Sequence, residues 1–221
     1  MIYNDWGIIL VAIAKNATTS IHQLLDEDMK FSCGQVHRTY KDISDIIHTQ
    51  DYVTISCVRN PYDRLYSAWK HIFHIDSSTN VKSEFKKFVK GELNSYITSD
   101  IHNDGHWSTQ SSYIVENDVV QVDWVFRFES LAEDWVEFTK WYNAQNITDN
   151  VLSDVLPMSN QTIKTEDPYD EETLDINNET LNLRFLSFEI LTLNFKNCHK
   201  KSRLPLSRRV KFNLQTSRGH L

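Results

Sequence analysis

An uninterrupted apolar run near the amino terminus constrains the fold more than any other feature of the chain. Residues 7–14 read GIILVAIA. This pattern is typical of a strand that is buried on both faces, as in a parallel sheet. The polar segment 15–18 interrupts the run, and Thr18, Thr19 and Ser20 are residue types that begin helices. Because apolar residues at helical spacing follow, we expect a strand, a loop and a helix in that order.

The same order recurs further along the chain. Residues 52–58 (YVTISCV) form a second apolar run, and Asn60 followed by Pro61 is typical of a helix start. A third strand is best placed at 124–128. Strands that alternate with helices favour an α/β domain. We therefore predict a three-layer fold, with a mainly parallel sheet flanked by helices and a P-loop-like strand–loop–helix at residues 7–25.

Further helices are predicted around these strands. Three helices are predicted at residues 40–47, 83–93 and 180–195, and the last of these segments is periodic in Leu, Ile and Phe. The middle one is expected to be a surface helix. Ser130 and Glu133 have the spacing of a capping box, which predicts that a helix begins there. Residues 95–112 and 157–172 are expected to be irregular.

The basic residues are concentrated at the end of the chain. The 221 residues suit one domain with a substantial core. The net charge is −7, but residues 196–221 carry +8, which leaves −15 on residues 1–195. We predict a domain over 1–195 and a basic tail over 196–221. The tail either docks on its own acidic domain or binds an anionic partner, and nucleic acid is not the partner we expect.

Three features bear on the cellular compartment. The longest apolar stretch, 7–14, is far shorter than the roughly 20 residues of a membrane-spanning helix, and it lacks a signal-peptide pattern. Cys33, Cys57 and Cys198 are scattered and odd in number, which favours free thiols. A glycosylation sequon begins at Asn16, inside the first loop, where a glycan would block the loop. We therefore predict a cytoplasmic protein without a membrane span.

The first loop has the composition of an anion site. Residues 14–20 read AKNATTS. Backbone N–H groups at a helix N-terminus attract anions, hydroxyl groups add donors, and Lys15 supplies a full charge. The Walker pattern needs a lysine after a glycine, whereas Lys15 precedes the hydroxyl residues and the loop has no glycine. An ordinary NTPase is therefore disfavoured, although the string alone also fits a simple helix start.

A second polar segment follows the second strand. Residues 57–69 read CVRNPYDRLYSAW. Arg59 leaves the carboxyl end of that strand, where open α/β sheets bind ligands, and Ser67 is expected on the polar side of the next helix. A guanidinium and a nearby hydroxyl suit a second phosphate. The alternative is that Arg59 or Arg64 only pairs with Asp63.

Together the two segments resemble the sulfotransferases that use 3′-phosphoadenosine-5′-phosphosulfate (PAPS), in particular the carbohydrate branch. That family has a PKTAGTS-like loop for the 5′-phosphosulfate and a VRNPYDRLVS-like segment for the 3′-phosphate. Three downstream segments also resemble it, namely HWSTQ at 106–110, DWVFRFESL at 123–131 and PYDEET at 168–173. The resemblance covers roughly residues 7–195. It implies that PAPS is bound by Lys15, Asn16, Ala17, Thr18, Thr19, Ser20, Arg59 and Ser67.

The chain departs from the family pattern at three positions. Ala14 and Thr109 stand where the family has proline, and Thr18 stands where it has glycine or serine. The changes at Ala14 and Thr18 are expected to alter the rigidity of the donor loop and the geometry of the donor. None of them removes a charged group that the chemistry needs.

The resemblance also implies the catalytic groups. Lys15 would neutralise the departing phosphate, and no divalent metal would be needed. His37, in a segment that resembles the family's H-x-T-x-x-[ED]-I stretch, is the preferred general base for the acceptor hydroxyl. His106 is the alternative base, or it shapes the acceptor pocket with Trp107 and Gln110. The acceptor would be a glycan or a small hydroxyl compound.

Three competing functions are compatible with parts of the sequence. A P-loop-like nucleotide kinase would need the Walker lysine that is absent here. A non-catalytic nucleotide- or glycan-binding module of the same fold would be expected to lose Lys15 or His37, and both are present. A function based on residues 196–221 predicts binding to nucleic acid or another anionic surface with a steep dependence on salt.

Overall fold

A four-stranded mixed sheet forms the centre of the protein. The structure, a computed structural model, describes residues 1–25, 37–75, 81–98, 105–157 and 168–173. The strand order is β1-β2-β3-β6, with bounds Ile2–Tyr3, Ile8–Val11, Val53–Val58 and Trp124–Arg127. β2, β3 and β6 are parallel, and β1 is an antiparallel edge strand on β2. The three parallel strands were predicted, whereas β1 was not, because two residues are too few to show a pattern.

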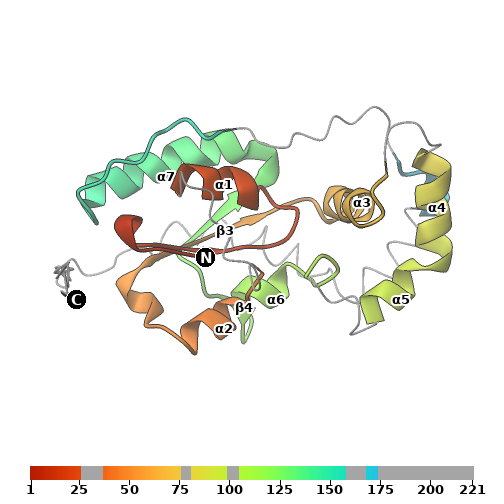
Figure 1. Ribbon diagram of the computed structural model, residues 1–221, viewed down its shortest axis with the longest axis horizontal. Helices are drawn as coiled ribbons and strands as arrows, with labels where there is room; N and C mark the ends of the chain where they lie inside the picture. Colours follow the sequence, from red (N-terminus) through yellow and green to blue (C-terminus); the bar gives the residue numbers. More distant parts are fainter. Residues whose placement is uncertain (26–36, 76–80, 99–104, 158–167, 174–221) are drawn as a thin grey trace, which may run out of the picture.

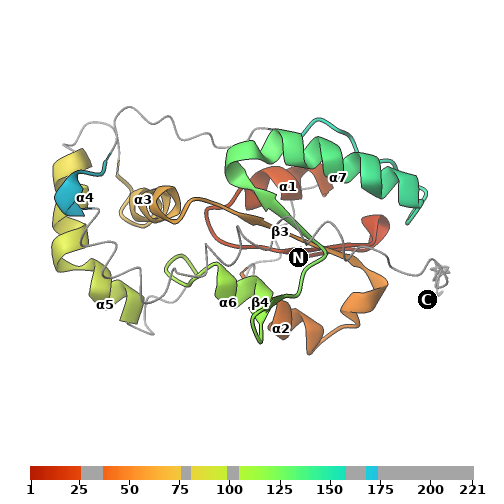
Figure 2. The same cartoon turned by 180° about the vertical axis from the view of Figure 1, so that it is seen from behind.

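Helices cover both faces of this sheet. In Figures 1 and 2, α1 (Thr18–Leu25) and α7 (Leu131–Gln145) lie on one face, and α2 (Tyr40–Ser44) and α6 (Ser111–Ile114) lie on the other. Successive residues of β2 alternate between the two apolar cores, so that Ile8 and Leu10 belong to one and Ile9 and Val11 to the other. Burial on both faces explains why the sequence of β2 is continuously apolar.

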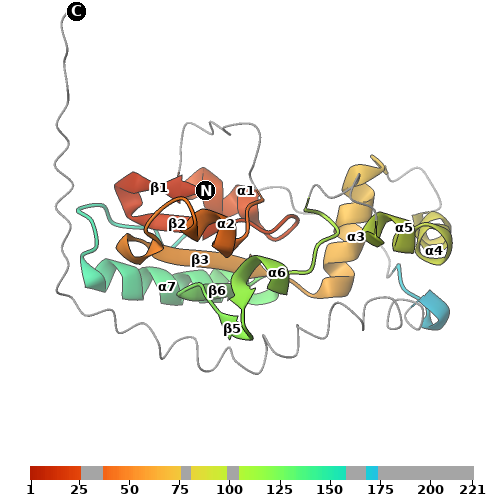
Figure 3. The same cartoon turned by 90° about the horizontal axis from the view of Figure 1, so that it is seen from below.

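A third apolar cluster lies beyond the carboxyl ends of the parallel strands. It packs α3 (Pro61–Ile72) against α4 (Val81–Gly91) and α5 (Leu93–Thr98), as Figure 3 shows. The Asn60 side chain accepts hydrogen bonds from the N–H groups of residues 62 and 63, which confirms the predicted cap of α3. The predicted surface helix corresponds to α4, which buries one apolar side against this cluster.

Several predicted boundaries and local structures are wrong. Helix α2 ends at Ser44 rather than at residue 47. Residues 95–112 are not irregular throughout, because α5 and α6 occupy parts of them. Both helices are short, at six and four residues, and helices of that length depend on tertiary packing rather than on a periodic pattern. The hairpin of β4 (Val115–Glu116) and β5 (Val119–Val120) was also not predicted.

The predicted capping box of α7 does not form. Ser130 makes no side-chain hydrogen bond to the backbone at the start of the helix. Its Oγ instead donates to Asp134 Oδ1 at 3.3 Å. The chain enters α7 through the 3-10 turn η4 (Phe128–Ser130), and the Leu131 N–H bonds to the carbonyl of residue 128. The Ser130 hydroxyl is therefore directed to the Asp134 carboxylate and not to the N–H group of Glu133, which a capping box requires.

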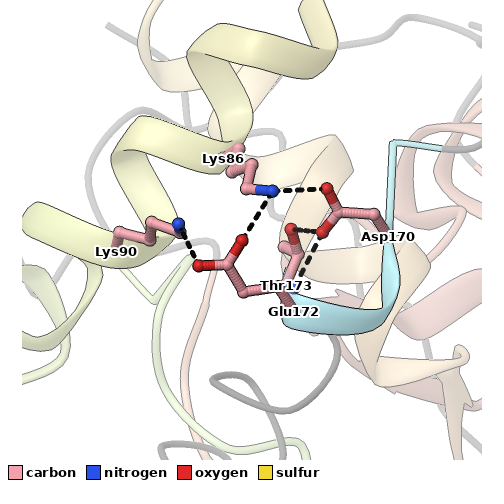
Figure 4. A network of polar contacts seen from close by, with 5 residues as sticks. All are labelled: Lys86, Lys90, Asp170, Glu172 and Thr173. Carbon is pink, nitrogen blue, oxygen red and sulfur yellow. Dashed lines mark hydrogen bonds and ion pairs between the residues drawn. The ribbon is translucent and has the colours of Figure 1, made fainter.

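A segment far along the chain docks on α4. Figure 4 shows Lys86 between Asp170 and Glu172, with Nζ to oxygen distances of 2.6 and 2.8 Å, and an ion pair between Lys90 and Glu172. The Tyr169 hydroxyl donates to the carbonyl of Tyr62 in α3 at 2.7 Å. These contacts hold the PYDEET segment against the third apolar cluster, and they neutralise two of the lysines of α4.

Other predictions fall on residues that the structure does not describe. The helix at 180–195, the tail at 196–221, and Cys33 and Cys198 lie outside the described residues, as does most of the loop at 157–172. Cys57 is a buried free thiol. Among the helices that the structure describes, none combines the length and the apolar character needed to cross a bilayer.

Candidate active site

The loop between β2 and α1 has an unusual backbone. Lys15 and Ala17 have φ angles of 68° and 57°, which lie in the left-handed region, whereas the φ of Asn16 between them is not positive. A non-glycine residue in this region costs about 1 kcal/mol or more, so the surrounding contacts must stabilise the loop. Alternating signs of φ turn successive N–H groups toward one side, which is how backbone concavities for anions are made.

Asn16 supplies much of this stabilisation. Its side chain is 1% exposed, and its Nδ2 donates to the Cys57 carbonyl oxygen at 2.9 Å and to Gln110 Oε1 at 2.6 Å. The Thr18 hydroxyl donates to the carbonyl of Ile13 at 3.1 Å. The loop is therefore attached both to its own strand and to the carboxyl end of β3.

Arg59 lies directly beside this loop. Its Nη1 donates to the Lys15 carbonyl oxygen at 3.3 Å, and its guanidinium carbon is 4.1 Å from the centroid of the Phe128 ring. Gln110 holds the Arg59 backbone from both sides, because Oε1 accepts from the Arg59 N–H at 2.9 Å and Nε2 donates to the Arg59 carbonyl at 2.8 Å. The structure therefore brings together the two segments that the sequence singled out.

The two cations of the site are partly buried and close to each other. Burial, and secondarily the charge of Arg59, lowers the pKa of Lys15. Burial also lowers the pKa of Arg59, against the opposing effect of Asp63 and Glu129. Within the part of the chain that the structure describes, Arg59 Nε is buried without a hydrogen-bond partner. An unpaired buried donor is costly, and an anion bound here would remove that cost.

His37 contacts the backbone just after β2, three residues before Lys15. Its Nδ1 lies 3.0 Å from the carbonyl oxygen of Ala12. A carbonyl oxygen only accepts, so in the neutral ring Nδ1 carries the proton and Nε2 has the free lone pair. The His37 ring makes an edge contact with the His106 ring at 5.9 Å, and His106 stacks on His71 at 5.3 Å. The preferred base and its alternative are therefore neighbours.

The predicted acceptor residues have different surroundings. Trp107 is 6% exposed and packs on Phe88 and Tyr96, so it belongs to the aromatic cluster of α4 and α5. The amide group of Gln110 is occupied by Asn16 and by the Arg59 backbone. Of the three predicted residues, His106 alone stands next to His37.

Two side chains on α3 differ from the sequence-based prediction. Ser67 is 7% exposed, so it is buried rather than on a solvent-facing polar side, because neighbouring segments cover most of α3. Arg64 does not pair with Asp63, since its guanidinium donates to the carbonyl oxygens of Ala14, Gly105 and Ser108. The sequence reasoning did not assign Arg64 to the site. The available signal was a cation on the apolar side of an amphipathic helix.

The fold and the site define a class of protein. It is an α/β protein whose polar and cationic residues gather at the carboxyl edge of parallel strands, which is where open sheets bind ligands. Residues 2–187 match the family model described as the sulfotransferase family, so the chain belongs to that family, whose chemistry is sulfuryl transfer. The resemblance to the carbohydrate branch is consistent with this match. Searches of curated proteins and of solved structures found no match.

Proposed function

We propose that the protein transfers the sulfuryl group of PAPS to an acceptor hydroxyl, most naturally on a carbohydrate. The observation that supports this best is the direct contact between the two cationic loops. Arg59 donates to the Lys15 carbonyl, and both side chains present partly buried positive charge at one edge of the sheet. A nucleotide with phosphate groups at both its 5′ and 3′ positions needs two such sites side by side.

In this proposal each part of the donor has its own residues. The N–H groups of residues 15–20 and the hydroxyls of Thr19 and Ser20 hold the 5′-phosphosulfate at the start of α1. The Thr18 hydroxyl donates to the Ile13 carbonyl, so Thr18 contributes its backbone N–H group. Arg59 holds the 3′-phosphate, and Ser67 adds a hydroxyl group. Lys15 stabilises the charge that develops on the leaving phosphate, which is where electrostatic catalysis is most effective.

His37 acts as the base in the same proposal. Its Nε2 accepts the proton of the acceptor hydroxyl while the acceptor oxygen bonds to sulfur and the bond from sulfur to the phosphate oxygen breaks. The hydrogen bond from Nδ1 to Ala12 orients the ring and stabilises the imidazolium that results. Base assistance of this kind contributes about 10²–10⁴-fold to the rate. His106 remains the alternative base.

No step of the proposed reaction depends on a divalent metal. Among the described residues, no group of three or more His, Cys, Asp or Glu side chains has the arrangement of a metal site. We also propose a cytoplasmic location. The sequon at Asn16 supports it, because that side chain is 1% exposed and hydrogen-bonded in the loop, where a glycan would not fit.

A transfer assay tests the proposal directly. The protein is incubated with PAPS and a panel of glycans and small alcohols, and formation of the desulfated nucleotide PAP and of sulfated product is measured. We expect turnover with at least one acceptor, PAP binding by calorimetry, and loss of both in Lys15→Ala and Arg59→Ala. Lys140→Ala, at an exposed position of α7, is the matched control. If the wild-type protein does not bind PAP, the proposal fails, and if it binds PAP without turning over any acceptor, a non-catalytic module is favoured.

A further inference from the structure

Arg64 is a buried cation that the proposed reaction does not use. It is 2% exposed and lies on α3. Removing a guanidinium from water is costly unless its N–H groups are satisfied. Among the described residues, no carboxylate pairs with it, and burial lowers its pKa to about 10. The desolvation cost of the Arg64 guanidinium must therefore be offset by hydrogen bonds to other groups.

The compensation comes from backbone carbonyl groups of two separate segments. Arg64 Nε donates to the Ala14 oxygen at 3.0 Å. Nη1 donates to the Ser108 oxygen at 2.9 Å, and Nη2 donates to the Gly105 oxygen at 3.1 Å. Because the guanidinium group is planar and rigid, three bonds from one fork fix the two segments relative to each other.

Each of these segments borders one half of the proposed site. Ala14 directly precedes Lys15 in the donor loop. Gly105 has a φ of 88°, and a Cβ added to it would lie 3.1 Å from the Cβ of His37 and 2.5 Å from the Tyr113 hydroxyl. That hydroxyl also donates to the Gly105 carbonyl at 3.3 Å. The His37 side chain therefore packs directly against the backbone of Gly105.

We propose that Arg64 is a positioning residue that fixes the separation between the donor loop at Lys15 and the base at His37. One guanidinium group donates to the carbonyl oxygens of both Ala14 and Gly105 and so holds them at a fixed distance. This inference rests on the proposed sulfuryl transfer. Arg64 touches neither the donor nor the acceptor in this account. A lysine at this position would keep the charge but not the rigid planar fork that directs three hydrogen bonds, so it would not replace Arg64.

The first test distinguishes a positioning role of Arg64 from a role in folding stability alone. Arg64→Met keeps much of the side-chain length, and Arg64→Lys keeps the charge. We expect both variants to bind PAP within about tenfold of the wild type, since Lys15 and Arg59 are intact. We expect kcat to fall about 100-fold, because a misplacement near 1 Å costs about that much. Leu65→Ala, a core truncation on the same helix, shows how much kcat is lost through destabilisation alone.

Chemical rescue supplies the second measurement. In Arg64→Ala, added methylguanidinium at a non-denaturing concentration is expected to raise kcat at least about tenfold, and methylammonium is not. The NMR resonance of the His37 ring, assigned with His37→Gln, should shift when PAP binds to the wild type and should not shift in Arg64→Met. If Arg64→Met folds poorly, the NMR measurement is made with Arg64→Lys instead.

The outcomes distinguish the two proposals. If the wild type neither binds PAP nor transfers sulfuryl, the proposed function fails. If the wild type is active and Arg64→Met keeps kcat within about threefold, the role of Arg64 is wrong. It is also wrong if Arg64→Ala loses activity only in proportion to its unfolded fraction and methylguanidinium does not restore kcat.

Discussion

Arg59 Nη1 donates a hydrogen bond to the carbonyl oxygen of Lys15 at 3.3 Å, across 44 residues of sequence. This bond joins the loop after β2 to the loop after β3. The side-chain amide of Asn16 makes a second connection, to Cys57 at 2.9 Å. Because β2 and β3 are parallel neighbours, both loops emerge at the same edge of the sheet. The site therefore behaves as one unit, and changes on either loop are expected to affect both.

The lowered pKa of Lys15 predicts how donor affinity depends on pH. Burial and Arg59 place this pKa below the ordinary value of 10.5. An anion binds the protonated form, so the affinity for PAP should fall as the pH rises through the lowered pKa. The phosphate groups of PAP are already fully ionised there, since their second pKa is about 6. Calorimetry at pH values from about 7 to 10 measures the decline.

Lys15→Arg is the matched variant for this experiment. Arginine keeps its charge throughout that pH range, so the decline should become much shallower. A wild-type affinity that stays constant up to the ordinary lysine pKa would contradict the assignment of Lys15 to the donor.

His37 and His106 are distinguished by separate substitutions. We expect His37→Ala to lower kcat by about 10²–10⁴-fold, with PAP binding unchanged, because a general base acts on the acceptor. His106→Ala should have a smaller effect on kcat. His48→Ala, at an exposed position, is the control. A His37→Ala variant that turns over at the wild-type rate would exclude His37, and a larger loss in His106→Ala would assign the base to His106.

Gln110 is expected to act on the donor side rather than on the acceptor. Its amide group makes three hydrogen bonds, one with Asn16 and two with the Arg59 backbone. Gln110→Ala leaves a buried N–H group unpaired, at a cost of about 1–3 kcal/mol, and loosens Arg59. The dissociation constant of PAP should rise about tenfold while the acceptor KM stays constant. Gln121→Ala, in which the lost bonds are confined to the β4–β5 hairpin, is the control. If Gln110→Ala raises only the acceptor KM, Gln110 contacts the acceptor, as the sequence predicted.

Ala17→Gly tests the backbone strain of the donor loop. Ala17 has a φ of 57°, a conformation that glycine adopts without a steric penalty. We expect the free energy of unfolding to be unchanged or to rise by up to about 1 kcal/mol. Ala132→Gly in the exposed part of α7 should instead lower it by about 1 kcal/mol. Urea unfolding of both variants gives the comparison, and equal destabilisation by the two changes would argue against strain at Ala17.

The lowered pKa of Asp134 predicts part of the loss of folding stability at acid pH. Burial acts to raise its pKa, but hydrogen bonds from the Arg127 side chain and N–H outweigh this and lower it. A carboxylate with a lowered pKa in the folded state contributes stability above its unfolded pKa of about 4, and this stability is lost as the pH falls. Thermal unfolding between about pH 3 and 7 should show a shallower acid decline in Asp134→Asn than in the wild type. Asp149→Asn, at an exposed loop position, should keep the wild-type slope.

The apolar runs of the three parallel strands and the cap of α3 were interpreted correctly. The strands β2, β3 and β6 and the start of α3 at Asn60 follow from apolar runs and capping residues that act over a few positions. The capping box at Ser130 and the end of α2 were wrong. A serine hydroxyl has several hydrogen-bond partners within a few residues, and the sequence does not show which of them it takes. Ser130 bonds to Asp134 instead of to the backbone at the start of α7.

By itself, the sequence determined the three parallel strands, the helices that follow β2 and β3, the family, and the two cationic loops. These depend on local propensity and on motifs that are contiguous in the chain. Only the tertiary structure decided that Asn16 and Gln110 hold the two loops together, that His37 presents Nε2, and that Arg64 links Ala14 to Gly105. The physical reason is that each of these contacts joins residues at least 25 positions apart, and such pairs meet only after the sheet has brought parallel strand ends to one edge.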